Sequence, residues 1–139
     1  MLSIQNLSIA FKSNNELTTV VHNISFELQQ QQILGIVGES GSGKSVTSLA
    51  VLGLLDKNAN VEGAILFNET DLTKISKKEF QKIRGNQISM IFQEPMSSLN
   101  PSLTCGYQVL EILLQHKKIS KSDENIKSDE IQMFFHHSS

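Results

Sequence analysis

The chain has 139 residues, of which 39% are hydrophobic and 19% are charged, and its formal net charge is −2. That length suits one globular domain, and the sequence has no basic surplus that would point to nucleic acid as a partner. No apolar run approaches the about 20 residues that a membrane-spanning helix needs, and the N-terminus lacks the features of a secretory signal. The single Cys105 cannot form an internal disulfide, which fits a reducing cytoplasm.

The first thirty residues are predicted to form two half-buried antiparallel strands. Apolar and mostly polar or small residues alternate over residues 7–11 and again over residues 24–28, the period expected when one face of a strand is buried. The polar segment Lys12–Leu17 between them is predicted to be a turn or loop.

The next segment has a different pattern. Ile33–Val37 is a short, continuous apolar run, as expected for a strand buried on both faces. A glycine-rich stretch follows at once, and Lys44–Leu55 is predicted to be a helix because Val46, Leu49 and Ala50 begin an apolar stripe at helical spacing.

The rest of the chain is predicted to form strands at Ala64–Phe67 and Gln87–Phe92 and helices at Ser76–Arg84 and Leu103–His116. Ser76 and Glu79 have the spacing of a capping box. Lysines and acidic residues then dominate residues 117–130, which are predicted to be a solvated helix or disordered.

The strongest motif is the glycine-rich stretch, which matches the pattern G-x-x-x-x-G-K-[ST] in full. Backbone N–H groups bind closely spaced phosphates well, and glycines permit the backbone path that points them inward. The following helix adds N–H groups without internal partners, while Lys44 can reach the β- and γ-phosphates and Ser45 can ligate Mg²⁺. The predicted binding residues are Gly38, Glu39, Ser40, Gly41, Ser42, Gly43, Lys44 and Ser45.

Kinases, GTPases and transporters share such a loop, and a second segment narrows the choice. Residues 90–101 read Met-Ile-Phe-Gln-Glu-Pro-Met-Ser-Ser-Leu-Asn-Pro. Together with the loop Gly-Glu-Ser-Gly-Ser-Gly-Lys-Ser, they resemble the ATP-binding subunit of ABC importers for dipeptides and oligopeptides, whose relatives take up nickel or glutathione. The resemblance runs from about Leu2 to about Lys118.

The resemblance implies an α/β fold, namely a P-loop NTPase core of the ABC type. This core would be incomplete, with an N-terminal antiparallel β-subdomain and the start of a helical subdomain. Residues 1–118 would form the N-terminal part of the ATP-binding domain, and residues 119–139 a charged or aberrant, poorly ordered tail. It further implies ATP and Mg²⁺ as cofactors, permease subunits and a second ATPase subunit as partners, and a peripheral place on the cytoplasmic side of the membrane.

Two further site residues follow from the resemblance. Gln93 matches the glutamine of the family's Q-loop, whose side-chain carbonyl reaches Mg²⁺ and the attacking water when the subdomains close. Phe11 lies where the family places an aromatic residue that stacks on adenine, a role that needs only a flat π-face. The expected Mg²⁺ ligands are thus Ser45 and Gln93. The alternative interpretation is an inward-facing strand residue for Phe11 and a polar loop residue for Gln93.

One position departs from the family pattern. Gln31 and Gln32 stand where the family usually has Gly-Glu before the loop-bearing strand. A glycine there indicates a tight turn with positive φ, in which glutamine costs roughly 1–2 kcal/mol.

Residues 1–139 also lack features that the resemblance implies. The family's signature loop, Leu-Ser-Gly-Gly-Gln, needs adjacent glycines, yet Gly106 is the only glycine after Gly85. No late apolar strand ends in the Asp-Glu of the Walker B pattern, and the late histidines, His116, His136 and His137, are interpreted as surface residues rather than as the switch histidine. Without the carboxylate that orients the attacking water, we expect ATP binding without hydrolysis.

The leading interpretation is therefore a truncated or frame-disrupted ABC ATPase subunit. With strands of its core missing, we expect it to be poorly stable or to aggregate when expressed alone. Two alternatives stay open: a genuine short regulatory protein that binds a nucleotide or a permease without catalysis, and a small P-loop kinase or other NTPase. The sequence does not identify the transported substrate.

Overall fold

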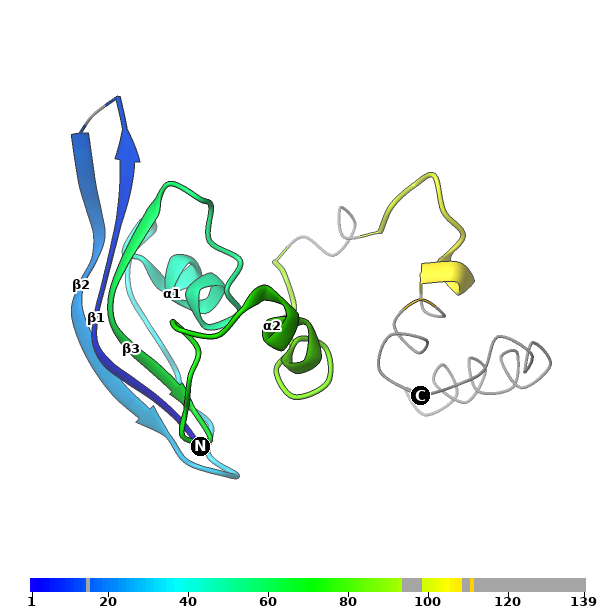
Figure 1. Cartoon of the computed structure of the whole chain (residues 1–139), viewed down its shortest axis with the longest axis horizontal. Helices are drawn as coiled ribbons and strands as arrows, with labels where there is room; N and C mark the ends of the chain where they lie inside the picture. The colour runs from blue at the N-terminus through cyan, green and yellow to red at the C-terminus, as the bar shows by residue number, and fades with distance from the viewer. Residues whose placement is uncertain (15, 94–98, 109–110, 112–139) are drawn as a thin grey trace. The chain divides into compact units, whose positions relative to one another are not determined.

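The computed structural model describes residues 1–14, 16–93, 99–108 and 111. The chain divides into two compact units, Met1–Gln81 and Lys82–Ser139, which are described separately below. The helices and strands along the described chain are β1 (Leu2–Ser13), β2 (Glu16–Leu28), α1 (Lys44–Val51), β3 (Ala59–Phe67), β4 (Thr70–Asp71) and α2 (Lys77–Ile83) (Figure 1).

The strands of the first unit form one antiparallel sheet in the order β2-β1-β3-β4. β1 and β2 make a hairpin whose pairing runs from Leu2 opposite Leu28 to Ser13 opposite Glu16. This confirms the predicted N-terminal antiparallel part, with longer strands than the alternation indicated. β3 also begins at Ala59 rather than at Ala64, and the short β4 was not predicted.

Irregular positions in the sheet are occupied by asparagine. Asn6 on β1 and Asn23 on β2 have φ values of 49° and 46°, where the register shifts, and asparagine tolerates this left-handed conformation better than most residues. Serine hydroxyls accept the displaced backbone N–H groups across the hairpin. Asn6 N–H donates to Ser25 Oγ at 2.8 Å, and Asn23 N–H donates to Ser8 Oγ at 3.0 Å.

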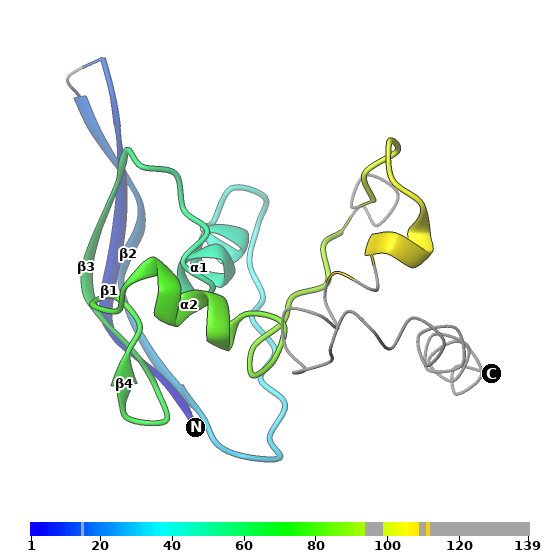
Figure 2. The ribbon, with the colours of Figure 1, turned by 45° about the vertical axis from the view of Figure 1, so that its right-hand side comes forward.

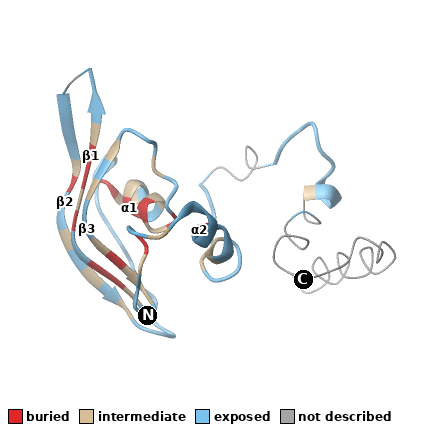
Figure 3. Ribbon diagram, in the orientation of Figure 1, coloured by how far each residue is buried: buried red, intermediate tan, exposed pale blue. Residues whose placement is uncertain are grey.

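The core of the first unit lies between one face of the sheet and α1, which covers that face in Figures 1 and 2. Figure 3 shows buried positions on the strands and on α1. The buried hydrophobic residues are Ile4, Leu7, Ile9, Ala10, Val21, Ala50, Leu52, Ile65, Leu72 and Phe80. Neither α1 nor any other helix among the described residues is long and apolar enough to cross a membrane.

The turn after β2 keeps the positive φ that the family pattern indicated. Gln31 has φ 63°, which confirms that glutamine occupies a position suited to glycine. The turn is closed by Gln32 N–H donating to the Gln29 carbonyl at 3.3 Å and by Gln29 N–H donating to Gln32 Oε1 at 3.0 Å.

The predicted buried strand at Ile33–Val37 is wrong. These residues form an extended segment outside any strand, and Ile33 and Val37 are 101% and 93% exposed. A strand buried on both faces needs neighbouring strands on both edges, and no strand in the described residues pairs with this one. The helix that follows ends at Val51 rather than at Leu55, because the chain turns at Gly53, whose N–H donates to the Ala50 carbonyl at 2.9 Å.

The capping box of α2 is confirmed. Ser76 N–H donates to Glu79 Oε2 at 2.7 Å, and Glu79 N–H donates to Ser76 Oγ at 3.4 Å. The two residues thus satisfy reciprocally the N–H groups that a helix start leaves without partners. Phe80, one residue further along, is buried.

In the second unit, the predicted buried strand at Gln87–Phe92 is also wrong. Ile91 is 95% exposed and Phe92 is 46% exposed, and only an isolated bridge joins Ile88 to Arg84. Residues 105–108 and 111 are helical, within the predicted helix at Leu103–His116. The remainder of that helix and the predicted tail at residues 119–139 lie outside the described residues.

A prediction concerns Gly63 on β3, beside the β1 irregularity. Gly63 has φ +93°, and an added Cβ would lie 2.5 Å from the Gln5 carbonyl oxygen and still closer to that of Asn6. Gly63→Ala should therefore lower the free energy of unfolding by about 2–4 kcal/mol, measured by urea denaturation. Gly35→Ala, where an added Cβ meets nothing within 4 Å, should change it by only about 0.5 kcal/mol; equal losses would contradict the prediction.

A second prediction concerns Asp71 in β4. Burial raises the pKa of its carboxyl, but hydrogen bonds from the Lys74 side chain and from Thr73 outweigh burial, so the pKa lies below the ordinary value of an aspartate. Lys74 Nζ lies 2.7 Å from Asp71 Oδ2, and Thr73 Oγ1 donates to Asp71 Oδ1 at 2.7 Å. Because the folded-state pKa is lowered, the ionised carboxylate stabilises the fold above the unfolded pKa, and this is lost as the pH falls through the folded pKa.

The stability difference between wild type and Asp71→Asn should accordingly shrink as the pH falls from about 5 to about 3. Urea unfolding at each pH measures it, and Asp56→Asn controls for the loss of one exposed carboxylate. A difference that stays constant over this range would show that the carboxylate contributes nothing through its charge.

Candidate functional site

The predicted phosphate-binding residues lie where the extended segment after β2 turns into α1. Residues 38–43 form the loop, and α1 begins at Lys44. Gly43 is the N-cap residue, with φ 86°, and no side chain caps the helix. Within the described part of the chain, the backbone N–H groups of Gly41 and Gly43 have no acceptor, so the loop and the start of α1 present donors without partners.

Close packing on β2 holds this end of the loop in place. An added Cβ at Gly43, which is buried, would lie 2.8 Å from both the Val20 carbonyl oxygen and Val21 Cγ2. Only a residue without a side chain permits this approach of loop to strand. The buried Thr47 reinforces the junction, because its N–H and its Oγ1 donate to the Gly43 carbonyl at 2.8 and 2.9 Å.

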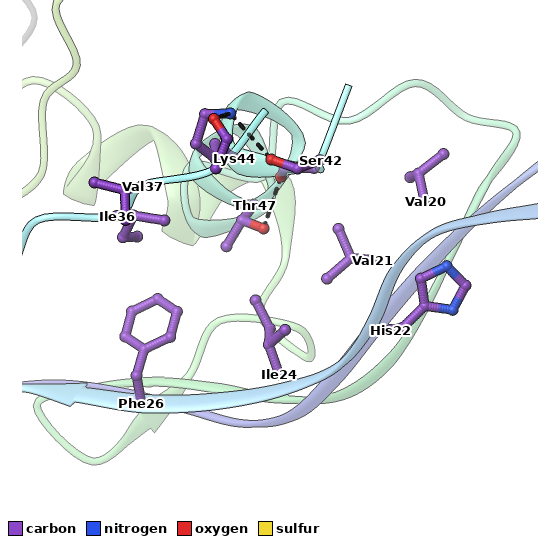
Figure 4. Close-up of a pocket in the computed structure, with 12 residues that line it drawn as sticks. Val20, Val21, His22, Ile24, Phe26, Ile36, Val37, Ser42, Lys44 and Thr47 are labelled. Carbon is purple, nitrogen blue, oxygen red and sulfur yellow. Dashed lines mark hydrogen bonds between the residues drawn. The ribbon is translucent and has the colours of Figure 1, made fainter. Parts of the chain in front are cut away.

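The Lys44 side chain folds back over the loop. Its Nζ donates to the Gly38 carbonyl at 2.8 Å, to the Glu39 carbonyl at 2.5 Å and to Ser42 Oγ at 3.0 Å, the last of which is drawn in Figure 4. An ammonium group has three donors, so these contacts use them all. An added Cβ at Gly38 would lie 2.7 Å from Ser42 Oγ, which shows how closely the loop is wrapped.

A cavity of about 340 Å³ opens beside the loop. Figure 4 shows that Val21, Ile24 and Phe26 on β2 point toward Ile36 and the start of α1. The wall of the cavity is therefore mostly apolar on the β2 side and mostly polar on the loop side. The lining residues are Val20, Val21, His22, Ile24, Phe26, Ile36, Val37, Gly38, Ser42, Gly43, Lys44 and Thr47.

This arrangement suits a compact anion with several charged oxygens. The unpartnered N–H groups and the start of the helix favour negative charge, and Lys44 supplies a cation at the same place. Ser45, the second residue of α1, is exposed, so its hydroxyl can contact a ligand or a hydrated cation. No group of three or more His, Cys, Asp or Glu residues that could hold a metal ion occurs among the described residues.

The structure brings the eight loop residues together in the first unit, whereas Phe11 does not line the cavity beside them. Phe11 lies on β1 opposite Thr18 and Ala59 and is partly exposed. Gln93 is exposed in the second unit. The roles of Phe11 and Gln93 stay predictions.

Sequence reasoning missed the residues that support the loop. Thr47 carries a detectable signal, because it is a hydroxyl residue among the apolar positions of the predicted helix and lies four residues after Gly43. Val20 and Val21 carry no detectable signal in the sequence, because their contact with Gly43 depends on how the chain returns to β2.

Comparisons with known proteins place this geometry in context. A family model described as ABC transporter matches residues 21–139. The chain is 48% identical over 125 residues to the dipeptide transport ATP-binding protein DppD of Lactococcus lactis, across 88% of this chain and 36% of that protein. It is 50% identical over 123 residues to DppD of Bacillus subtilis, across 87% of this chain and 37% of that protein. The chain thus spans little more than a third of the length of these relatives.

A solved structure agrees with the sequence matches. The ATP-binding cassette MJ0796, in a dimeric post-hydrolysis state bound to ADP and Pi, matches with a TM-score of 0.73 and 26% identity. The match covers 95% of this chain and 55% of that chain. The chain therefore has the fold of part of an ATP-binding cassette.

A third prediction distinguishes the effect of close packing on stability from the effect of backbone conformation, at two glycines of the loop. Gly43 and Gly41 both have positive φ, but an added Cβ meets β2 at Gly43 and nothing within 4 Å at Gly41. Gly41→Ala should lower the free energy of unfolding by roughly 1–2 kcal/mol through backbone conformation alone. Gly43→Ala should lower it by about 2 kcal/mol more, because the loop must move off β2. Urea denaturation measures both, and similar losses would show that the contact with β2 is unimportant.

Proposed function

The chain belongs to the ABC transporter family, and on that premise we propose that it binds Mg-ATP through residues 38–45 as part of the ATPase of a peptide importer. The observation that carries the proposal is the junction of loop and helix. There, Gly43 is packed on β2, and the Lys44 ammonium lies over a loop in which, within the described part of the chain, the N–H groups of Gly41 and Gly43 have no acceptor. A triphosphate is the ligand that uses all of these groups together.

The residues present fit the phosphate groups. The glycines keep the loop free of side chains that would fill the space where oxygens approach the backbone, and the N-terminus of α1 has no side-chain cap to compete with them. In this proposal, the Lys44 ammonium exchanges its bonds to loop oxygens for bonds to the β- and γ-phosphates. The Ser45 hydroxyl is a ligand to Mg²⁺, which neutralises phosphate charge when bound.

The finer parts of the site rest on the family pattern. We propose that Phe11 stacks on the adenine ring and that Gln93 contributes a second oxygen ligand to Mg²⁺. Phe11 is partly exposed at the end of β1 away from Leu2, which leaves part of its ring available for stacking. Gln93 is exposed, so its amide is available for a ligand.

Substrate class and partners follow from the names of the relatives. Both DppD proteins are described as ATP-binding proteins of dipeptide transport. We propose the same role for this chain, on the cytoplasmic side of the membrane and in contact with permease subunits and a second ATPase subunit. The cavity beside the loop joins an apolar wall to a cationic loop, which supports a nucleotide rather than a peptide as the ligand of this region.

We also propose that these 139 residues bind ATP with negligible turnover. Hydrolysis needs a positioned water as well as a neutralised phosphate. Lys44 and Mg²⁺ held by Ser45 can supply neutralisation. The sequence of residues 1–139 contains neither Leu-Ser-Gly-Gly-Gln nor an apolar run ending in the Asp-Glu pair that would orient the water.

A fourth prediction tests nucleotide binding. Lys44→Ala removes the ammonium that would contact two phosphates, and it should weaken Mg-ATP binding about 100-fold, as expected for losing charge-assisted hydrogen bonds. Titration with a fluorescent ATP analogue, repeated by calorimetry with ATP, measures the dissociation constant. Lys57→Ala, which removes an exposed lysine elsewhere in the first unit, is the matched control and should leave binding unchanged.

Equal effects of the two substitutions, or no binding by the wild type, would contradict the proposed site. Phosphate release by the wild-type chain tests the proposal on turnover separately. Mg²⁺-dependent release that Lys44→Ala abolishes would show that the chain hydrolyses ATP, while leaving the binding site itself intact.

A further inference from the structure

Thr47 in α1 carries a buried hydroxyl group that makes one hydrogen bond. The residue is 4% exposed, and its Oγ1 donates to the Gly43 carbonyl at 2.9 Å, which is the only hydrogen bond of this side chain within the described part of the chain. Figure 4 shows the side chain pointing from α1 into the cavity, toward Val21 and Ile24 of β2. Its neighbours on β2 are apolar, so packing alone does not require the hydroxyl.

Packing would be served as well by a residue without a hydroxyl. Threonine has a lower helix propensity than leucine or alanine, and a hydroxyl that bonds to the carbonyl four residues earlier slightly destabilises a helix. Valine has nearly the shape of threonine and leaves no buried polar group to satisfy. What the Thr47 hydroxyl adds to the structure is therefore its bond to Gly43.

The Gly43 carbonyl accepts two hydrogen bonds from this one residue. The Thr47 N–H donates to it at 2.8 Å, in addition to Oγ1. This carbonyl belongs to the planar peptide group that joins Gly43 to Lys44, in which the N–H of Lys44 points away from the carbonyl oxygen. One bond at a carbonyl tolerates a broad range of directions, so the second bond narrows the orientation of the peptide and thereby of the Lys44 N–H.

The Lys44 N–H is a donor at the start of the helix. Lys44 is the first residue of α1, so its N–H is one of those that a helix leaves without an internal partner. Within the described part of the chain, this N–H has no acceptor. Peptide N–H groups point toward the N-terminal end of their helix, which here is the end joined to loop 38–43.

We propose that Thr47 is a positioning residue for phosphate binding, whose hydroxyl acts through the Gly43 carbonyl to hold the Lys44 N–H in the direction of a bound phosphate oxygen. Hydrogen bonds in a chain also polarise one another, so the bonds accepted by the carbonyl strengthen the N–H as a donor. The inference rests on the function proposed for residues 38–45, and it adds to that site a residue that acts through its neighbours.

The experiment compares Thr47→Val with Thr47→Ser in the full chain. Valine keeps the shape and removes the hydroxyl, whereas serine keeps the hydroxyl and removes a methyl group. Thr47→Val should weaken Mg-ATP binding about three- to tenfold, the effect of losing one neutral hydrogen bond, as measured by calorimetry. Thr47→Ser should bind Mg-ATP within about twofold of the wild type, because the bond to Gly43 is kept.

Nuclear magnetic resonance reports on the Gly43 peptide itself, without nucleotide. The carbonyl carbon of Gly43 should move upfield in Thr47→Val, because the carbonyl has lost a hydrogen bond, and should stay near its wild-type position in Thr47→Ser. Ile65→Val is the control for lost stability, since Ile65 is buried on β3 and does not line the cavity beside the loop. It should lower the urea midpoint and leave the dissociation constant of Mg-ATP unchanged.

Three outcomes would overturn the inference and leave the proposed function standing. They are equal affinities of the wild type and Thr47→Val, a loss of affinity in Thr47→Ser or Ile65→Val as large as in Thr47→Val, and a Gly43 carbonyl signal that does not move in Thr47→Val. The absence of Mg-ATP binding by the wild type would instead overturn the proposed function and the inference together.

Discussion

The contact between Gly43 and β2 is the constraint on which the candidate site depends. It places the start of α1 against the sheet at a distance that no side chain would permit. The loop before it, the Lys44 ammonium above it and the cavity beside it are all positioned by this single approach of backbone to backbone. β2 therefore serves three purposes, since it pairs with β1, supports the loop and forms the apolar wall of the cavity.

The register of the hairpin in turn determines which part of β2 meets the loop. Because side chains alternate between the two faces of a strand, a shift of one residue would turn Val21 away from Gly43. The irregularities at Asn6 and Asn23 are held by serine hydroxyls on the opposite strand. Gly63 on β3 leaves room for the carbonyls that the irregularity in β1 brings close. The geometry of a phosphate loop thus depends partly on residues far from it in the sequence.

The features predicted correctly from the sequence are those whose cause lies within a few residues. The capping box of Ser76 and Glu79 needs only their spacing, the alternation over residues 24–28 needs only one buried face, and the positive φ at Gln31 needs only the local turn. The strands expected at residues 33–37 and 87–92 failed because a doubly buried strand is stable only beside other strands. Their apolar composition indicates that they need neighbouring strands, and no strand among the described residues pairs with either segment in the sheet.

The loop keeps its shape although residues 33–37 before it are unpaired within the described part of the chain. In the proposed role, affinity for phosphate depends on the local positions of Gly43, Thr47 and Lys44, which α1 and β2 hold without help from residues 33–37. Lys44 already donates to three loop oxygens. The proposed binding of a nucleotide would therefore exchange existing hydrogen bonds for new ones, and its affinity would reflect the difference between the two sets. The phosphate oxygens carry net negative charge, whereas the loop oxygens are neutral, and hydrogen bonds to charged acceptors are stronger. This difference in charge favours the exchange.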